Sequence, residues 1–206
     1  MNIVMFGPPG AGKGSVSAIV AKEFHYPHIA AGDIVRAEAK KPHNKVEEFM
    51  KKGELVPDKV IMDLVLERLQ QKDCKQGFIL DGFPRTIAQA EFLETKKIHI
   101  DAVISLEVDE EEVIKRLGGR MMDPKTGEIY NINTMKLPKG IKKESLTQRP
   151  DDKPEVIHNR LEVYNNQTAP VMKFYKKKNA VASVDANPEL DKVVEQVRAV
   201  IKDKRK

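Results

Sequence analysis

A glycine-rich turn near the N-terminus constrains the fold more than any other segment of the sequence. An apolar strand pattern over residues 2–6 leads directly into Gly7-Pro-Pro-Gly10-Ala-Gly12-Lys13-Gly14-Ser15, and a helical pattern begins at Lys13. In this context the glycine amides point inward, a helix N-terminus adds positive potential, and Lys13 reaches the outer phosphates of an anion. The alternative is a tight connection without a ligand. Four glycines and a lysine in this register favour phosphate binding.

The same order of strand and helix recurs along the chain. Further strand patterns span residues 77–81, 102–108 and 180–184, and helical patterns span residues 87–95, 109–117, about 154–176 and the segment after Pro188. This alternation predicts βαβ units and a parallel sheet covered by helices on both faces. We therefore expect an α/β fold, a P-loop three-layer α/β/α sandwich. Its last helix carries an apolar stripe made of Leu190, Val193, Val194, Val197, Val200 and Ile201.

Two segments interrupt the alternation. Residues 30–56 contain short, polar, lysine-rich helical patterns with little core material, and residues 119–152 are crowded with glycine and proline. A structureless loop of the second segment's length is uncommon in a compact domain unless it is a lid or a small β subdomain. We interpret both as insertions into a core that consists of residues 1–29, 57–118 and 153–206.

Composition narrows the class of protein. The 206 residues include 36 Lys and Arg against 31 Asp and Glu, and no apolar run approaches the roughly 20 residues of a membrane span. The first apolar run follows directly on Met1 and Asn2 without a positive leader, so we expect a cytoplasmic protein. The lone Cys74 excludes an internal disulfide and is interpreted as structural. The five histidines are scattered, and we interpret them as structural or solvated.

The arginines are distributed unevenly. Only nine of the 36 basic residues are arginine, and six of the nine border an insertion or follow a predicted strand: Arg36, Arg85, Arg116, Arg120, Arg149 and Arg160. Arginine binds phosphate through a rigid, bidentate fork. Several guanidinium groups in one cleft repel each other unless a polyanion lies between them, and two bound nucleotides carry enough charge. The sequence therefore predicts that these arginines line a nucleotide cleft.

The segment Asp81-Gly-Phe-Pro-Arg85 ends a predicted strand. Ligands of open parallel sheets gather at the carboxyl ends of the strands. There Asp81 could hold Mg²⁺ through water and Arg85 could bind a phosphate, whereas the alternative is a turn whose aspartate caps a helix. Asp33, beside Gly32 and Arg36, is open to the same two interpretations.

In combination and register these motifs resemble the adenylate kinases, within the nucleoside monophosphate kinase family, along nearly the whole chain. The matching segments are residues 7–15, 31–36, 55–58, 81–86 with Gln89, 116–120, 126–130, 149–152 and 160–170. The resemblance implies a parallel-sheet core, an AMP-binding insertion at residues 30–56 and a lid over ATP at residues 119–152. It also implies the reaction of MgATP with AMP to give two ADP.

The resemblance also implies roles for individual residues. ATP would be bound by Gly10, Ala11, Gly12, Lys13, Gly14, Ser15, Arg116, Arg120, Ile129 and Tyr130. AMP would be bound by Ala31, Arg36, Glu54, Leu55, Val56, Gly82, Arg85, Gln89, Arg149 and Arg160, with Gln89 at the adenine edge. The catalytic cations would be Lys13, Arg85, Arg120, Arg149 and Arg160. Mg²⁺ would be held through water by Asp33 and Asp81, while Asp151 and Asp152 would position the lid and its arginines.

The sequence departs from the family's pattern at positions that bear on specificity and metal binding. Ala31 stands where many adenylate kinases carry a Thr or Ser, and pyrimidine monophosphate kinases often carry Ala there, so a UMP/CMP kinase is the nearest alternative. Gln89 and the long lid favour adenylate kinase. In the lid, Asp123 and Thr126 stand where zinc-binding relatives carry cysteines, so we expect no structural zinc.

The expected partners are ATP, AMP and ADP, without nucleic acid or membrane, and the family is commonly monomeric. A P-loop switch or nucleic-acid-binding module is an alternative from another class. It would need only one nucleotide site and would show salt-sensitive affinity for nucleic acid. Arg36, Arg85 and Gln89 argue against it because they describe a second, monophosphate site.

Overall fold

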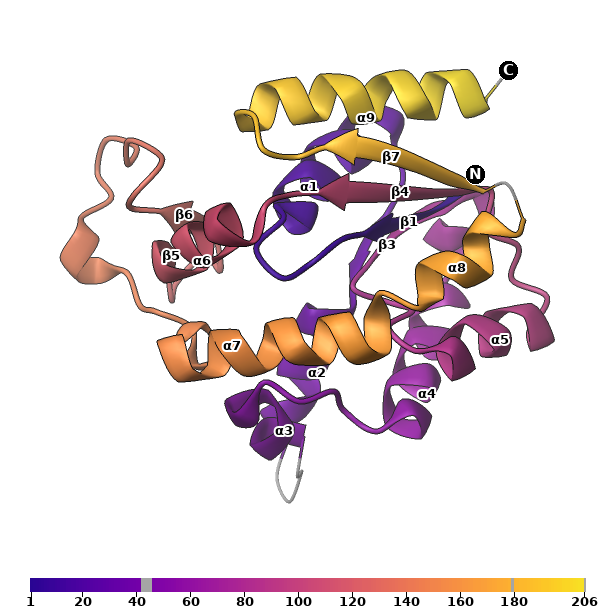
Figure 1. Ribbon diagram of the computed structural model, residues 1–206, viewed down its shortest axis with the longest axis horizontal. Coiled ribbons are helices and arrows are strands. Elements are labelled where there is room, and N and C mark those ends of the chain that lie inside the picture. The colour runs from indigo at the N-terminus through magenta and orange to yellow at the C-terminus, as the bar shows by residue number, and fades with distance from the viewer. Residues whose placement is uncertain (42–45, 179, 206) are drawn as a thin grey trace.

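The computed structural model, which describes residues 1–41, 46–178 and 180–205, has a central parallel sheet between two layers of helices (Figure 1). The sheet has five strands in the order β2-β3-β1-β4-β7, and every neighbouring pair is parallel. The strands are β1 (Asn2–Phe6), β2 (His28–Ala30), β3 (Phe78–Asp81), β4 (Ala102–Glu107) and β7 (Val181–Asp185). The predicted α/β sandwich with a parallel sheet is confirmed.

Alternation along β1 explains why both faces of the sheet are covered. Ile3 and Met5 belong to the core under α1 (Lys13–Phe24) and α9 (Leu190–Lys204). Val4 and Phe6 point to the opposite face, where the core includes residues of α2, α4, α5 and α8. These four helices span Ala31–Ala39, Asp58–Leu69, Ile87–Thr95 and Val171–Lys176. A strand buried on both faces is continuously apolar, as the sequence of β1 is.

The second insertion leaves the sheet at the carboxyl ends of its strands. α6 (Glu110–Gly118) follows β4 and leads into a two-stranded antiparallel sheet of β5 (Arg120–Met122) and β6 (Ile129–Asn131). Short 3₁₀ turns at Lys143–Ser145 and Pro150–Asp152 precede α7 (Pro154–Val163). Figure 1 shows this small sheet projecting from the side of the core to which the arrowheads of β4 and β7 point.

Several elements differ from the sequence-based expectation. The helix expected over residues 154–176 is interrupted after α7 by a π-helical turn, Tyr164–Thr168, and by the turn before α8. The Ala169 amide donates to the Tyr164 carbonyl, five residues back, at 2.8 Å, and Pro170 has no amide hydrogen with which to continue the helix. The pattern analysis also did not identify β2, α4 or the 3₁₀ turn Lys72–Gln76.

The first insertion contributes more to the core than its polar sequence indicates. It contains α2 and α3 (Val46–Lys52), and residues 42–45 between them lie outside the described residues. Ala31, Val35, Val46 and Val56 are all buried in the cluster that covers one face of the sheet. A few apolar residues at helical spacing are therefore enough to attach this segment to the core. Over the part of the chain that the structure describes, no helix combines the length and apolar character needed to cross a membrane.

The packing of α9 gives a prediction about stability. Ile201 has an exposed fraction of 0%, whereas the side chain of Ile114 on α6 is 42% exposed. We expect Ile201→Ala to lower the free energy of unfolding by about 2–5 kcal/mol, because it leaves a cavity under α9. Ile114→Ala, the matched control, should change it by less than about 1 kcal/mol. Urea unfolding measures both, and equal losses in the two variants would contradict this account of the core.

Candidate active site

The glycine-rich loop between β1 and α1 curls around the side chain of Lys13. The Lys13 ammonium donates to the carbonyl oxygens of Gly7 and Pro8, both at 2.8 Å. Glycine is required at position 7, where φ is +140° and a Cβ would lie 2.6 Å from the Leu106 carbonyl oxygen. The loop ends at Gly12, the N-cap of α1, which has no side chain with which to cap the helix. The first amides of α1 thus have no side-chain cap.

Lys13 lies among other cations. The pKa of Lys13 is lowered from its usual 10.5 to about 8, chiefly by burial and in addition by Arg85, Arg160 and Arg120, while Asp81 acts in the opposite direction. Charges act on one another in this way only over short distances. The structure therefore brings the glycine-rich loop together with arginines from the β3–α5 loop, the lid and α7.

Asp81, at the end of β3, is the nearest anionic partner of this loop. A Cβ on Gly14 would lie 3.4 Å from the Asp81 Oδ2, and the His28 Nε2 lies 3.5 Å from the same oxygen. Burial raises the pKa of Asp81, but His28 and the charge of Lys13 outweigh it, so the net shift is downward. An ionised carboxylate beside a phosphate-binding loop suits water-mediated binding of Mg²⁺.

Asp33, the other predicted magnesium residue, lies in a different environment. Its side chain is 68% exposed and forms an ion pair with Arg36 one turn along α2. Both carboxylates have the oxygen chemistry that Mg²⁺ prefers, but Asp81 alone of the two is mostly withdrawn from solvent. Among the described residues, there is no group of three or more His, Cys, Asp or Glu side chains arranged to hold a metal.

Asp151 and Asp152, just before α7, hold Arg120 of β5 and Arg160 of α7. Asp152, with an exposed fraction of 0%, accepts a hydrogen bond from the Arg120 Nε at 2.6 Å and one from the Arg160 Nη1 at 2.9 Å. The Asp151 Oδ2 lies 3.0 Å from the same Arg160 nitrogen. Burial raises the pKa of Asp151, yet Arg160, Arg120 and Arg149 together hold it below the usual range. These aspartates partly neutralise a cluster of arginines that would otherwise repel each other.

The positive charges of Arg149 and Arg85 are less fully balanced by nearby acceptors and carboxylates. The Nε of Arg149 is buried and has no hydrogen-bond partner in the described part of the chain. Burial, together with Arg36 and Arg120, lowers the pKa of Arg149 to about 10. Burial and Arg160 likewise lower the pKa of Arg85, whose Nε donates to the Gly82 carbonyl oxygen at 2.7 Å. Buried guanidinium groups without a full set of partners are suited to bind an anion.

The residues expected around the monophosphate come from α2, α5 and α7 and from the loops that precede α4, α5 and α7. Ala31, at the start of α2, and Val56 are buried, while Leu55 is half-buried and Glu54 is exposed. Gly82 has φ of +75°, and a Cβ there would lie 2.8 Å from the Arg85 Nη2. Glycine at this position lets the arginine lie close to the backbone.

Of the residues expected around the ATP base, Arg116 is bound by protein groups. Its Nε donates to the Glu112 carboxylate at 2.9 Å and its Nη2 to the Asn187 carbonyl oxygen at 3.0 Å. Ile129 and Tyr130 lie on β6, opposite Met122 and Met121 of β5. The positions at which some relatives carry zinc ligands instead hold a turn, since Asp123 accepts from the Lys125 amide and Thr126 from the Glu128 amide.

Comparison with known proteins agrees with this geometry. The family model for adenylate kinase matches residues 5–180. A protein named adenylate kinase from Thermoanaerobacter sp. (strain X514) is 42% identical over 219 residues, which cover 100% of both chains. One from Treponema denticola is 46% identical over 205 residues, 94% of this chain and 96% of that protein. One from Methanocella arvoryzae is 44% identical over 218 residues, which cover 98% of this chain and 99% of that protein.

The chain belongs to the adenylate kinase family. It is therefore a nucleoside monophosphate kinase, an enzyme class that transfers phosphoryl groups between nucleotides. Membership accounts for a site with so many cations, because phosphoryl transfer requires positioning and charge stabilisation more than a strong base.

The sequence analysis of this adenylate kinase family member missed contacts that join distant segments. His28 was grouped with structural or solvated histidines, but its Nε2 lies beside Asp81; His43, another of that group, lies outside the described residues. Asp58 and Thr86 lie in segments that match the family, but the resemblance implies no role for either. Asp58 accepts a hydrogen bond from the Gln89 side chain, and Thr86 accepts one from the Gln89 backbone amide. Each contact depends on strand order or on helix packing, which short motifs do not show.

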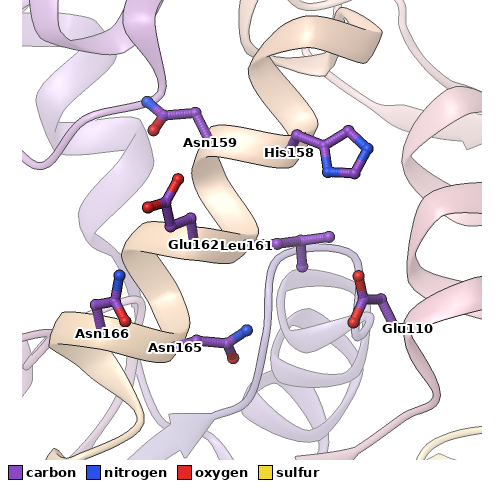
Figure 2. Close-up of a pocket in the computed structure, with 7 residues that line it drawn as sticks. All are labelled: Glu110, His158, Asn159, Leu161, Glu162, Asn165 and Asn166. Carbon is purple, nitrogen blue, oxygen red and sulfur yellow. The ribbon is translucent and has the colours of Figure 1, made fainter.

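One pocket in the described part of the chain lies away from the predicted site residues. It has a volume of about 510 Å³ and is lined by Glu110, His158, Asn159, Leu161, Glu162, Asn165 and Asn166. Figure 2 shows Leu161 of α7 pointing toward Glu110, which comes from α6. Arg160 is not among the lining residues because helical periodicity turns it to the other side of α7, toward Asp151 and Asp152. The cationic site is thus distinct from this cavity.

The lowered pKa of Lys13 predicts a pH dependence of activity. Because the ammonium loses its proton near pH 8 in the free enzyme, kcat/KM for MgATP should fall as pH rises through about 8. The unfolded chain keeps this proton up to about 10.5, so the same group should make unfolding free energy rise with pH between these values. A pH profile of kcat/KM tests the first point. In Lys13→Met, kcat/KM should no longer fall as pH rises through about 8. If this variant still shows the fall, a group other than Lys13 titrates there.

The burial of Asp152 predicts a structural cost for removing its charge. Asp152→Asn leaves Arg120 and Arg160 facing a neutral amide, so we expect unfolding free energy to drop by about 3 kcal/mol, with lower kcat. Glu144→Gln is the control, because Glu144 is an exposed acidic residue of the same insertion. Urea unfolding and initial rates measure both effects. A change below about 0.5 kcal/mol in Asp152→Asn would mean that Asp152 does not hold the two arginines.

Proposed function

We propose that this enzyme catalyses the reversible transfer of a phosphoryl group from MgATP to AMP, giving two ADP. The observation that carries the proposal is the gathering of Lys13, Arg85, Arg120, Arg149 and Arg160, four of which have a pKa lowered by burial and by other cations. Such a cluster is costly without a polyanion, and two nucleotides supply one. The names of the relatives support ATP and AMP as those nucleotides.

Each part of the site has a role in this proposal. Residues 10–15 and Lys13 bind the phosphates of ATP, with Arg116, Ile129 and Tyr130 near its base. Arg36 and Arg85 bind the phosphate of AMP, and Gln89 contacts its adenine within the insertion of residues 30–56. Arg120, Arg149 and Arg160 stabilise the transferring group when residues 119–152 close over it. The partners are ATP, AMP and ADP, and by resemblance to the family the enzyme acts as a monomer in the cytoplasm.

The chemistry follows from the charges. In-line transfer through a loose transition state spreads negative charge over the phosphoryl oxygens, and preorganised cations stabilise that charge. Water is the competing acceptor. A lid that completes the arginine cluster only when both substrates are bound excludes water at the moment of transfer. Asp152 pairs with Arg120 within the lid, and Asp151 and Asp152 both pair with Arg160 of α7, so these aspartates join the lid's arginine to the helix that follows it.

Magnesium fits the same arrangement. Asp81, and less directly the exposed Asp33, would hold the ion through water; Asp81 lies beside Gly14 at the start of α1. When bound, Mg²⁺ neutralises charge on the phosphates of ATP. The role of Asp81 itself is to keep an ionised carboxylate at this position, which its lowered pKa supports.

A UMP/CMP kinase is the second candidate, and Ala31 favours it. The Ala31 side chain is buried at the start of α2 and has no hydroxyl with which to contact a base. Initial rates with MgATP and AMP, CMP, UMP or GMP in turn separate the candidates, with hydrolysis in the absence of acceptor as the control. Preference for AMP supports adenylate kinase activity, preference for UMP or CMP supports the alternative, and hydrolysis without transfer would exclude a two-nucleotide mechanism.

Arg85 gives the sharpest test of the cationic site. Arg85→Ala should lower kcat/KM for AMP by about a thousandfold, because a buried cation facing the phosphates is lost. The fold should persist, since Arg85 makes no ion pair within the described residues. Arg198→Ala is the control, because Arg198 is paired with Glu23 on the far layer of helices. Near-normal turnover by Arg85→Ala would refute the role of this arginine.

A further inference from the structure

Gln89 lies in a hydrogen-bond network that engages both ends of its side-chain amide. Gln89 has an exposed fraction of only 2%. Its Oε1 accepts from the Arg85 backbone amide at 2.6 Å, and its Nε2 donates to the Asp58 Oδ1 at 2.7 Å. The other oxygen of Asp58 accepts from the Thr86 hydroxyl at 2.9 Å. Asp58 is the first residue of α4, so its carboxylate joins the starts of α4 and α5.

This network fixes which way the Gln89 amide faces. A carboxylate only accepts hydrogen bonds, and a backbone N–H only donates them. If the amide turned over, its oxygen would face the Asp58 carboxylate and its NH₂ group would face the Arg85 N–H. Both contacts would be mismatched, and unmet polar groups in a buried position are costly. Asp58 and the Arg85 amide therefore hold the oxygen and nitrogen of Gln89 in one order.

The fixed amide keeps capacity for a ligand. An amide oxygen accepts two hydrogen bonds and an NH₂ group donates two, so the contacts above leave one lone pair and one N–H of Gln89. Adenine presents a ring nitrogen that accepts beside an amino group that donates, and cytosine presents the same pair. Uracil and guanine present a ring N–H beside a carbonyl oxygen, the reverse pair. An amide held in the order that suits adenine repels uracil and guanine at the same position.

We propose that Asp58 is a positioning residue that makes the monophosphate site select bases with an amino group, adenine and cytosine, over uracil and guanine. The inference rests on the proposed function, in which Gln89 contacts the base of AMP and Arg36 and Arg85 fix the phosphate. It also answers the question raised by Ala31: the site without a hydroxyl at position 31 still rejects UMP. The expected order of acceptors is AMP, then CMP, with UMP and GMP far behind.

A purely structural role for the network is the competing account. Thr86 is the N-cap of α5 and accepts from the Gln89 amide at 3.2 Å, so Thr86 and Gln89 resemble a capping box. A cap that only stabilises α5 would affect every acceptor equally when it is weakened. A device that orients the amide would change the ratio between acceptors. The ratio of kcat/KM values for two acceptors is measured on one sample, so it does not depend on the fraction of active enzyme.

The test compares kcat/KM for AMP, CMP, UMP and GMP in the wild type and in Asp58→Asn. Asparagine keeps the size of the side chain but offers an NH₂ group, which can donate to the Gln89 oxygen. The Gln89 amide can then turn over and lose only its contact with the Arg85 backbone amide. We expect the ratio of AMP to UMP to fall by about tenfold, through a higher KM for AMP and an unchanged KM for MgATP. Asp63→Asn is the control, an exposed aspartate on the same helix, and should leave all ratios unchanged.

Gln89→Ala separates this inference from the proposed function. If Gln89 contacts the base, Gln89→Ala reduces the ratio of AMP to UMP, and adding Asp58→Asn then changes it less than about twofold. If Gln89→Ala leaves the ratio unchanged, the proposed role of Gln89 is wrong. If Gln89→Ala reduces the ratio but Asp58→Asn lowers all four acceptors equally, the inference about Asp58 alone is overturned. Urea unfolding of each variant identifies losses that come from a weakened α5.

Discussion

The repulsion among cations at the carboxyl ends of the strands is the constraint on which the rest of the site depends. Lys13, Arg85 and Arg160 belong to segments that are far apart in sequence, yet Arg85 and Arg160 both lower the pKa of Lys13, and Arg160 also lowers that of Arg85. A fold tolerates this only with anions beside the cations. Asp81 supplies one next to Lys13, and Asp151 and Asp152 supply two more at the end of the lid. The glycine-rich loop adds the carbonyl oxygens of Gly7 and Pro8. The remaining positive charge is what phosphates bind.

The sequence predicted most of the sheet, because strands buried on both faces are short apolar runs with clear ends. It did not reveal β2, which has three residues and begins with His28, a residue that pattern analysis does not associate with a buried strand. The single helix expected before β7 is interrupted by a π-helical turn at Tyr164–Thr168, whose mostly polar sequence gives no sign of the break. Local sequence patterns indicate which residues are buried, but they say less about the backbone conformation between those residues.

The candidate site was predictable where chemistry is carried by short motifs, as at Lys13, Asp81 and Arg85. What could not be predicted is which groups those residues already contact. Arg116 is bound by Glu112 and by the Asn187 carbonyl oxygen, a contact that spans 71 positions of the chain. Gln89 is bound by Asp58, 31 positions earlier. Such partners depend on strand order and helix packing, and they decide whether a side chain is fixed or can still move.

In the proposed function, the two nucleotide positions therefore follow different physical rules. Around the phosphates, charge is in excess and geometry is adjustable: the Nε of Arg149 has no partner among the described residues, and Arg36 pairs with an exposed aspartate. Binding energy there comes from neutralising a repulsion that the fold already contains, so it is large for any polyphosphate and selects little. Around the Gln89 amide, which is proposed to contact the base, each hydrogen bond is directed, and the Asp58 carboxylate fixes the order of donor and acceptor. Selection among bases must arise there, because a mismatched donor or acceptor in a buried site is costly, whereas the phosphate is common to all four acceptors.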